Sequence, residues 1–275
     1  SAAFTITAKT LLLYPHLDLL VTPSTGMNHI ARGEVEAAGA KVMSLLDNRA
    51  ELETISASSE FTFLLLLAAM RRFSEGIAIA ASGRWHDDNA VRGNELQGKT
   101  VGLVGYGRIG RRLHGWLNAF GANVMFSDPY VYKQWDAAMR ERLGIEDNIS
   151  SPGENSLDFL FSVCNAVVIC CAYTPQTHGM ITGAHLLSMQ RNGVVVNTSR
   201  GEVLDERSVL DALDKRADLR LAVDVLPGEV TGTQNPALWL DSGVLVTPHM
   251  AGTTIESQTK AARIALQYVR DFKYL

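Results

Sequence analysis

The stretch TVGLVGYGRIGRRLHGWLNAFGANVMFSDPY, residues 100–130, decides the fold of this 275-residue chain. Its apolar start predicts a buried strand, and the pattern G-x-G-x-x-G follows at Gly105, Gly107 and Gly110. A helical pattern opens there, and a second apolar run ends at Asp128, eighteen residues beyond Gly110. A strand, a glycine loop, a helix and a second strand ending in an acid together predict a dinucleotide-binding unit.

Each glycine of this loop has a physical task. Gly105 permits the tight turn, Gly107 lets the backbone approach a pyrophosphate, and Gly110 lets helix and strand pack closely. The helix begins at Arg108 and Ile109, where unpaired N–H groups and the helix dipole favour phosphate. We therefore expect all five residues to bind the cofactor. A purely structural glycine turn is the alternative.

Asp128 indicates which dinucleotide is bound. Its carboxylate can accept hydrogen bonds from the ribose hydroxyls of the adenosine, and its charge would repel a 2′-phosphate. The sequence therefore predicts NAD rather than NADP. Arg108 is the one residue that argues the other way, because it could neutralise an extra phosphate.

Apolar runs of strand length alternate with helical patterns over most of the chain. Such alternation is typical of a parallel sheet covered on both faces, with ligands at the carboxyl ends of the strands. A longer helix is expected over residues 58–82, apolar nearly all round and so buried between lobes or subunits. The predicted strands lie in LDLLVTP, TVGLVGYG, ANVMFSDP, AVVICCAYTP, GVVVNTSRG, LRLAVDVLP and GVLVTPHMAG.

The composition excludes several classes of protein. A net charge of −4 offers no basic surface for nucleic acid. The longest apolar run, FTFLLLLAAM, is too short to cross a bilayer, and we expect no membrane partner. Cys164, Cys170 and Cys171 fit small core hydrophobes in a reducing, cytoplasmic compartment, and no Cys/His spacing suggests a metal site.

Several motifs in one order resemble the NAD-dependent D-2-hydroxyacid dehydrogenase family. After the glycine loop come TPQTHGMI, NTSRGEVLD, AVDVLPGE and TPHMAGTT, and the similarity runs from about residue 20 to the end of the chain. The resemblance implies an α/β fold, with a doubly wound parallel sheet (Rossmann) beside a smaller, shortened flavodoxin-like substrate lobe. It places the substrate lobe at residues 1–54 plus 250–275 and the dinucleotide-binding domain at residues 55–249.

The resemblance also implies a catalytic trio. Its arginine, glutamate and histidine fall on Arg200, Glu229 and His249. A histidine can supply a proton near neutral pH, a glutamate can stabilise the imidazolium, and a guanidinium can bind a substrate carboxylate. These are the groups that reduction of a 2-keto acid requires.

Other contacts follow from the same motifs. The loop VTPSTGMNHI resembles the one whose N–H groups contact the substrate carboxylate. The cofactor contacts implied beyond the glycine loop are Thr174, Pro175, Thr198, Ser199, Asp224, Ala251 and Gly252. The substrate contacts implied are Ser24, Thr25, Gly26 and Met27, together with Arg200.

The predicted function is hydride transfer between NAD(H) and a small 2-hydroxy or 2-keto acid, by a homodimer (EC 1.1.1.-). Family members usually carry more chain before this point, so we expect an incomplete substrate lobe or one rebuilt by partner contacts. Two alternatives stay open. One is an NAD(H)-sensing regulator of the corepressor kind with little catalysis, and the other is a related chemistry such as formate or phosphite oxidation.

Overall fold

The computed structural model describes residues 5–85, 88–130 and 156–272 and divides the chain into two compact units. The smaller unit comprises residues 1–58, 228–234 and 252–275, and the larger comprises residues 59–227 and 235–251. These bounds differ from the predicted domains mainly at the turn 228–234, which joins the smaller unit. The roles assigned to the two domains stay predictions.

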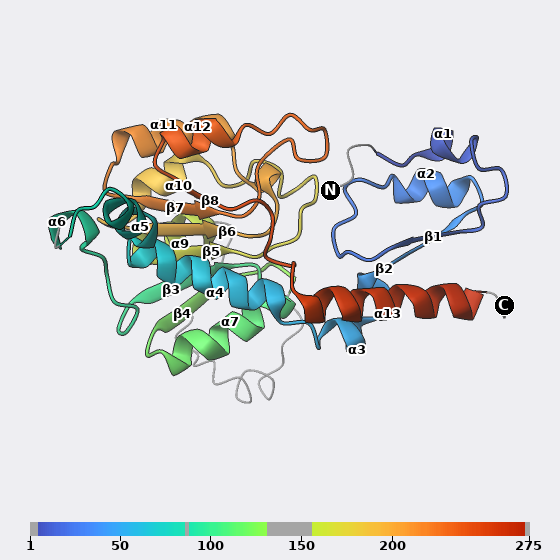
Figure 1. Cartoon of the computed structure of the whole chain (residues 1–275), viewed down its shortest axis with the longest axis horizontal. Coiled ribbons are helices and arrows are strands. Elements are labelled where there is room, and N and C mark those ends of the chain that lie inside the picture. The colour runs from blue at the N-terminus through green and yellow to red at the C-terminus, as the bar shows by residue number, and fades with distance from the viewer. Residues whose placement is uncertain (1–4, 86–87, 131–155, 273–275) are drawn as a thin grey trace. The chain divides into compact units, whose positions relative to one another are not determined.

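The larger unit is built on a six-stranded sheet in which all neighbouring strands are parallel (Figure 1). Four of the strands are buried almost throughout, as expected when helices cover both faces. In spatial order the strands are β4 (Asn123–Ser127), β3 (Thr100–Val104), β5 (Ala166–Ile169), β6 (Val194–Asn197), β7 (Arg220–Val223) and β8 (Leu245–Val246).

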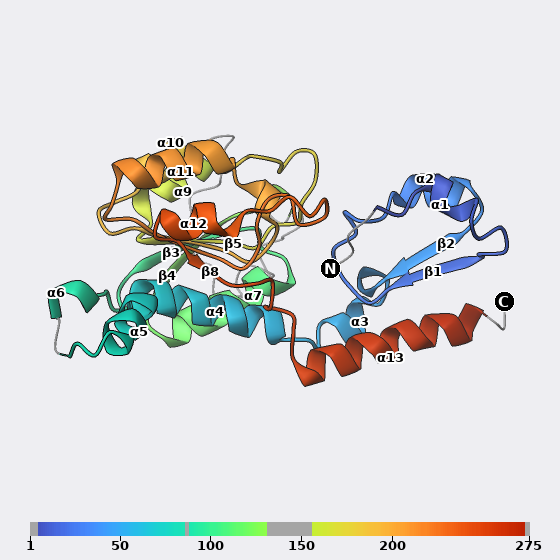
Figure 2. The same cartoon turned by 45° about the horizontal axis from the view of Figure 1, so that its top comes forward.

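Two layers of helices enclose this sheet, as Figure 2 shows. Each layer forms its own apolar core with the sheet face beneath it, so the doubly wound architecture is confirmed. A short helix α6 (Asp88–Val91) and a 3₁₀ turn η3 (Gly201–Val203) complete the unit. One layer holds α4 (Ala57–Met70), α5 (Phe73–Ala81) and α7 (Arg108–Ala119), and the other holds α9 (Ser156–Val163), α10 (Gly183–Ser188), α11 (Glu206–Lys215) and α12 (Pro236–Asp241).

The strand order places a topological switch point at β3. The chain runs from β3 to β4 on one side and then returns to β5 on the other side. At such a point the loops that leave two neighbouring strands diverge, and ligands bind outside their carboxyl ends. The glycine loop leaves β3 at this position.

The single helix predicted over residues 58–82 is wrong, because the chain breaks between α4 and α5. Arg72 has a left-handed backbone with φ of 52°. The carbonyl of Met70 accepts a hydrogen bond from the N–H of Asn94 at 2.8 Å. The chain therefore turns at the point where the last carbonyl of α4 is paired with a distant segment instead of with the next helical turn.

The smaller unit contains a parallel pair of strands, β1 (Leu19–Thr22) and β2 (Lys41–Ser44). Helices lie on both sides of this pair (Figure 2), and each side has a small apolar core. An isolated bridge joins Ile6 to Ile30. The helices and turn are α1 (Ala8–Leu11), α2 (Arg32–Ala37), η1 (Leu45–Asp47), α3 (Arg49–Leu52) and α13 (Ile255–Phe272).

One stretch of the described chain, Arg49–Met70, is long and apolar enough to pass a test for a membrane span. It runs through α3 and α4 and includes the non-helical residues between them. Leu65, Leu66 and Met70 are nearly inaccessible in the core beneath the sheet. Packing of α4 against the sheet therefore buries part of its apolar surface.

Candidate functional site

The glycine loop between β3 and α7 has the geometry that the sequence predicts. Gly105 has a φ of 95°, and a Cβ placed on it would lie 2.7 Å from the backbone of Cys171 in the neighbouring loop. A Cβ on Gly110 would lie 2.4 Å from the carbonyl oxygen of Gly105. Both positions therefore exclude any side chain, one through the turn and one through close packing of the helix on the loop.

The third glycine leaves room for a ligand. Gly107 is exposed, and a Cβ on it would meet no protein atom within 4 Å. It is the N-cap residue of α7 and, being glycine, has no side chain to cap that helix. The first N–H groups of a helix lack intrahelical acceptors, so the diphosphate of a dinucleotide fits this end of α7.

Asp128 faces the same loop from the end of β4. Its Oδ2 accepts a hydrogen bond from the N–H of Tyr106 at 2.8 Å, and its Oδ1 accepts one from the N–H of Tyr130 at 2.9 Å. The carboxylate is thus held beside the glycine loop. A carboxylate oxygen can accept more than one hydrogen bond, so a ribose hydroxyl is a chemically suitable donor for this group.

The loop after β6 is organised by Asn197, a residue that the sequence analysis did not assign to the site. Its fully buried side chain accepts hydrogen bonds from the N–H and hydroxyl of Ser199 and donates one to the carbonyl of Arg200. A Cβ on Gly201 would lie 1.9 Å from the carbonyl carbon of Leu226. The sequence R-G therefore marks a turn that only glycine can make against the β7 loop.

Thr198 and Thr174, two of the predicted cofactor contacts, lie in the loops after β6 and β5, and each forms a hydrogen bond with another threonine. The hydroxyl of Thr198 forms a buried hydrogen bond of 2.6 Å with that of Thr62 on α4. After β5, the N–H of Thr174 donates to the hydroxyl of Thr177, and Pro175 follows exposed to solvent. Thr62 is another residue that sequence patterns did not indicate, because it lies 136 residues away from its partner.

His249 follows β8 and has a left-handed backbone with φ of 52°. The carboxylate of Asp224, at the end of β7, is 1% exposed and accepts hydrogen bonds from the backbone on the far side of that histidine. Its Oδ1 receives the N–H of Met250 at 2.9 Å, and its Oδ2 receives the N–H of Ala251 at 2.8 Å. Asp224 therefore fixes the segment that carries His249.

The larger unit thus carries its predicted site residues on loops at the carboxyl ends of its strands. The smaller unit holds the remainder. Glu229 is half-buried in the turn 228–234, and Gly252 opens the last segment of that unit. In the loop after β1, the hydroxyl of Ser24 donates to the carbonyl of Gly26 at 2.8 Å, and the carbonyl of Met27 accepts the N–H of Ile30. Thr25 lies between them, half-buried.

A buried polar pair lies beneath the glycine loop. The hydroxyl of Tyr106 forms a 2.5 Å hydrogen bond with Nδ1 of His114 on α7, and the Tyr106 ring stacks on Phe126. Burial lowers the pKa of His114 and raises the pKa of Tyr106 to about 12. A neutral histidine in such a pair has a structural role. The sequence places neither His114 nor His86 in a partner motif and so predicts no catalytic role for either, and His86 lies outside the described residues.

The cysteines have environments that disfavour thiolate chemistry. Burial raises the pKa of the Cys164 thiol to about 12 and that of Cys171 to about 11. Burial also raises the pKa of Cys170, whose Sγ lies 3.1 Å from the carbonyl oxygen of Gly105. Within the described ranges, no group of three or more His, Cys, Asp or Glu side chains could hold a metal ion.

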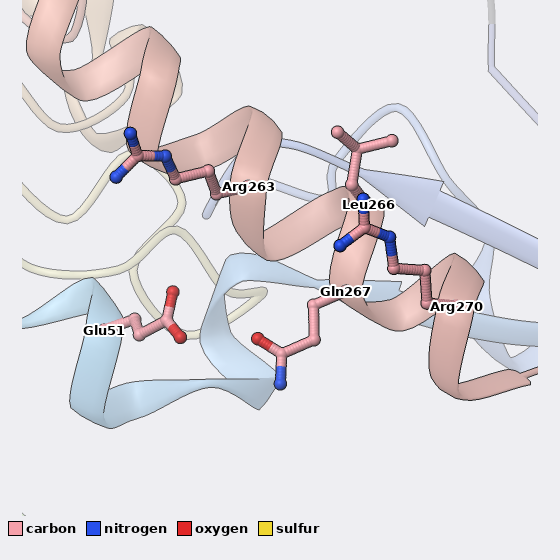
Figure 3. Close-up of a pocket in the computed structure, with 5 residues that line it drawn as sticks. All are labelled: Glu51, Arg263, Leu266, Gln267 and Arg270. Atoms are coloured by element: carbon pink, nitrogen blue, oxygen red, sulfur yellow. The ribbon is translucent and has the colours of Figure 1, made fainter.

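A separate hollow lies on the smaller unit between α3 and α13 (Figure 3). It involves none of the predicted site residues. Its lining residues are Glu51, Arg263, Leu266, Gln267 and Arg270.

A family model and the curated relatives of this chain indicate the same protein family. Residues 63–251 match the model for D-isomer specific 2-hydroxyacid dehydrogenase, NAD binding domain. D-3-phosphoglycerate dehydrogenase of Methanocaldococcus jannaschii is 32% identical over 256 residues, which cover 92% of this chain and 45% of that protein. Glyoxylate reductase of Thermofilum pendens is 31% identical over 254 residues, which cover 91% of this chain and 70% of that protein.

Solved structures support the fold. D-lactate dehydrogenase from Aquifex aeolicus, complexed with NAD and lactic acid, superimposes with a TM-score of 0.81 at 24% identity. The match covers 98% of this chain and 80% of that one. This chain spans about half the length of the phosphoglycerate dehydrogenases that it matches, at 45–47% of each.

Proposed function

Because this chain belongs to the D-isomer specific 2-hydroxyacid dehydrogenase family, we propose that it interconverts a small 2-keto acid and the corresponding 2-hydroxy acid with NAD(H). The observation that carries the proposal is the placement of three features on one sheet edge. These are the open glycine loop, the Arg200 turn held by Asn197, and the His249 segment held by Asp224.

Each side chain has a chemical role in the proposed reaction. When bound, the nicotinamide supplies the hydride to the carbonyl carbon. Glu229 stabilises the imidazolium form of His249, which donates its proton to the carbonyl oxygen and is left as the neutral imidazole. Arg200 binds the substrate carboxylate and polarises the carbonyl.

The remaining predicted contacts belong to the same proposal. Ser24, Thr25, Gly26 and Met27 would meet the substrate carboxylate from the smaller unit. Thr174, Pro175, Thr198, Ser199, Asp224, Ala251 and Gly252 would line the cofactor. We further propose a cytoplasmic homodimer.

NADH is proposed to be preferred over NADPH. Asp128 is supported by two backbone donors, which keep its carboxylate beside the loop where the adenosine ribose would lie. A 2′-phosphate would meet this negative charge. Arg108, at the first position of α7, is the group that would favour NADPH if the proposal is wrong.

The proposal is tested by following NADH absorbance with a panel of glyoxylate, hydroxypyruvate and phenylpyruvate. At least one acid should be reduced, and His249→Gln should lower kcat by about 100-fold or more. Arg200→Ala should instead raise KM about 10- to 100-fold, since it removes a charged hydrogen-bond donor. Binding of NADH that changes the oligomer size, with no acid reduced, would instead establish the NAD(H)-sensing regulator.

A further inference from the structure

We propose that Thr247 and Asp224 act as positioning residues that hold His249 in its left-handed backbone conformation, ready for proton transfer. The inference rests on the proposed function, because it assigns a purpose to the orientation of His249. It gives a role to Thr247, the first residue of the motif TPHMAGTT, to which the sequence assigned none.

The geometry places hydrogen bonds to one carboxylate on both sides of the histidine. The hydroxyl of Thr247, two residues before His249, donates to Asp224 Oδ1 at 2.6 Å. The N–H groups of Met250 and Ala251, one and two residues after it, donate to the same carboxylate at 2.9 and 2.8 Å. The N–H of His249 itself closes the turn onto the carbonyl of Thr247 at 3.0 Å.

The hydrogen bonds suit the backbone conformation that they surround. A left-handed backbone at a residue other than glycine is uncommon and persists where the surrounding structure fixes it. Hydrogen bonds to an ionised acceptor are stronger than those between neutral groups. Three donors converge on the carboxylate of Asp224, which is 1% exposed, and two of them belong to the residues directly after His249.

The same aspartate also connects the histidine segment to the arginine segment. The N–H of Asp224 donates to the carbonyl of Asn197 at 3.0 Å, and the side chain of Asn197 donates to the carbonyl of Arg200 at 2.9 Å. The N–H of Thr247 is anchored to the carbonyl of Val223 at 2.9 Å. The backbones that carry Arg200 and His249 are thus held through one buried network. A misplacement of about 1 Å in such a network can cost about 100-fold in rate.

The test compares Thr247→Val, which keeps the shape and removes the hydroxyl, with Thr247→Ser, which keeps the hydroxyl. Thr247→Val should lower kcat about 10- to 100-fold, with the KM of the acid and the Kd of NADH changed less than about threefold. Thr247→Ser should restore kcat to within about threefold of the wild type. Thr182→Val is the matched control, because the Thr182 hydroxyl is also half-buried and pairs with His185 in the same unit. It should leave kcat unchanged.

A second readout needs neither cofactor nor turnover. Amide hydrogen exchange of Met250 and Ala251 in the free protein should accelerate about tenfold in Thr247→Val, which corresponds to about 1.4 kcal/mol of lost protection. If that variant fails to fold, Asp224→Asn replaces it. Its NH2 group takes the place of one acceptor oxygen and leaves the N–H of Met250 or Ala251 without that acceptor, so it should cause the same kind of acceleration and a loss of kcat.

The outcomes separate this inference from the proposed function. Wild-type kcat and amide protection in Thr247→Val, while His249→Gln has collapsed, would overturn the inference alone. A higher Kd for NADH with unchanged kcat would also overturn it, because Thr247 would then serve the cofactor. Wild-type turnover in His249→Gln would refute the proposed function, and amide exchange would then decide the structural part by itself.

Discussion

Asn192 and His249 have left-handed backbones at opposite edges of the same sheet, and a carboxylate lies beside each of them. Asn192 lies before β6 with φ of 60°, and its N–H donates to Asp218 at 2.8 Å. His249 lies after β8 with φ of 52°, and the N–H that follows it donates to Asp224 at 2.9 Å. In the first case the carboxylate accepts the N–H of the left-handed residue itself, and in the second it accepts the N–H of the next residue.

The two carboxylates differ in their surroundings. Asp218 is partly exposed and forms a fork with Arg216, whose Nε and Nη2 lie 2.7 and 2.9 Å from its two oxygens. Asp224 is buried and receives neutral donors from the chain around His249. At the amino edge the left-handed residue is also an asparagine, a type that tolerates this conformation.

Under the proposed function, the strain at the carboxyl edge is accepted because the chemistry needs the side chain of His249. At the amino edge, Asn192 tolerates the left-handed conformation and Arg216 pairs with Asp218, so these residues contribute to the stability of the fold. The carboxyl edge keeps a histidine in a less favoured conformation and supports it from a buried carboxylate. Substitutions at the two edges should therefore separate stability from activity.

The largest expected effect is at the carboxyl edge, in the glycine loop. Gly110→Ala should weaken NADH binding by about 100-fold or more, because its Cβ would collide with the carbonyl of Gly105 and displace the loop. Fluorescence titration with NADH measures the change. Gly115→Ala is the control on the same helix, since its Cβ meets nothing within 4 Å. It should leave affinity unchanged and raise the free energy of unfolding by about 1 kcal/mol. Equal affinities in both variants would contradict the account of the loop.

At the amino edge, Asp218→Asn should lower the free energy of unfolding by about 1 kcal/mol and leave kcat unchanged. Urea unfolding and steady-state turnover measure the two quantities. A large loss of kcat in Asp218→Asn would show that the amino edge contributes to activity as well as to stability.

This stability difference should depend on pH. Hydrogen bonds from Arg216 hold the pKa of Asp218 well below its usual range. A carboxyl group with a depressed pKa stabilises the fold at neutral pH, and that contribution is lost as the unfolded chain takes up a proton. The gap between wild type and Asp218→Asn should therefore be full at pH 7 and shrink below about pH 4.

The smallest expected effect is at Asn192. Asn192→Ala should lower the free energy of unfolding by about 0.5–1 kcal/mol, because alanine tolerates positive φ less well than asparagine. Thermal unfolding measures this loss, and kcat should stay at the wild-type value. A more stable variant would contradict the strain assigned to this turn.

Much of the fold could be predicted from the sequence. The apolar runs ending at the glycine loop, at Asn197 and at Asp224 identified strands that are buried on both faces. Strand β2 was not predicted, because it is short and alternates exposed with buried residues. The break at Arg72 could not be predicted either, since it depends on a hydrogen bond to Met70 from a segment more than twenty residues away.

Some residues of the candidate site could be predicted from the sequence, and others could not. The family resemblance indicated Arg200, Glu229, Asp224 and His249, and the role of Glu229 beside His249 stays a prediction. Thr62 lies in no motif, and Thr247 opens the motif TPHMAGTT without a predicted role. The hydrogen bonds of both threonines form only when distant segments meet in the folded sheet.

The most direct test of the central claim is the turnover of His249→Asn with NADH and the best keto acid of the panel. Asparagine accepts the left-handed backbone and cannot act as a proton donor near neutral pH. We expect a stable protein with wild-type affinity for NADH and a kcat lower by about 100-fold or more. A kcat within about twofold of the wild type would contradict the assignment of this sheet edge as the catalytic centre.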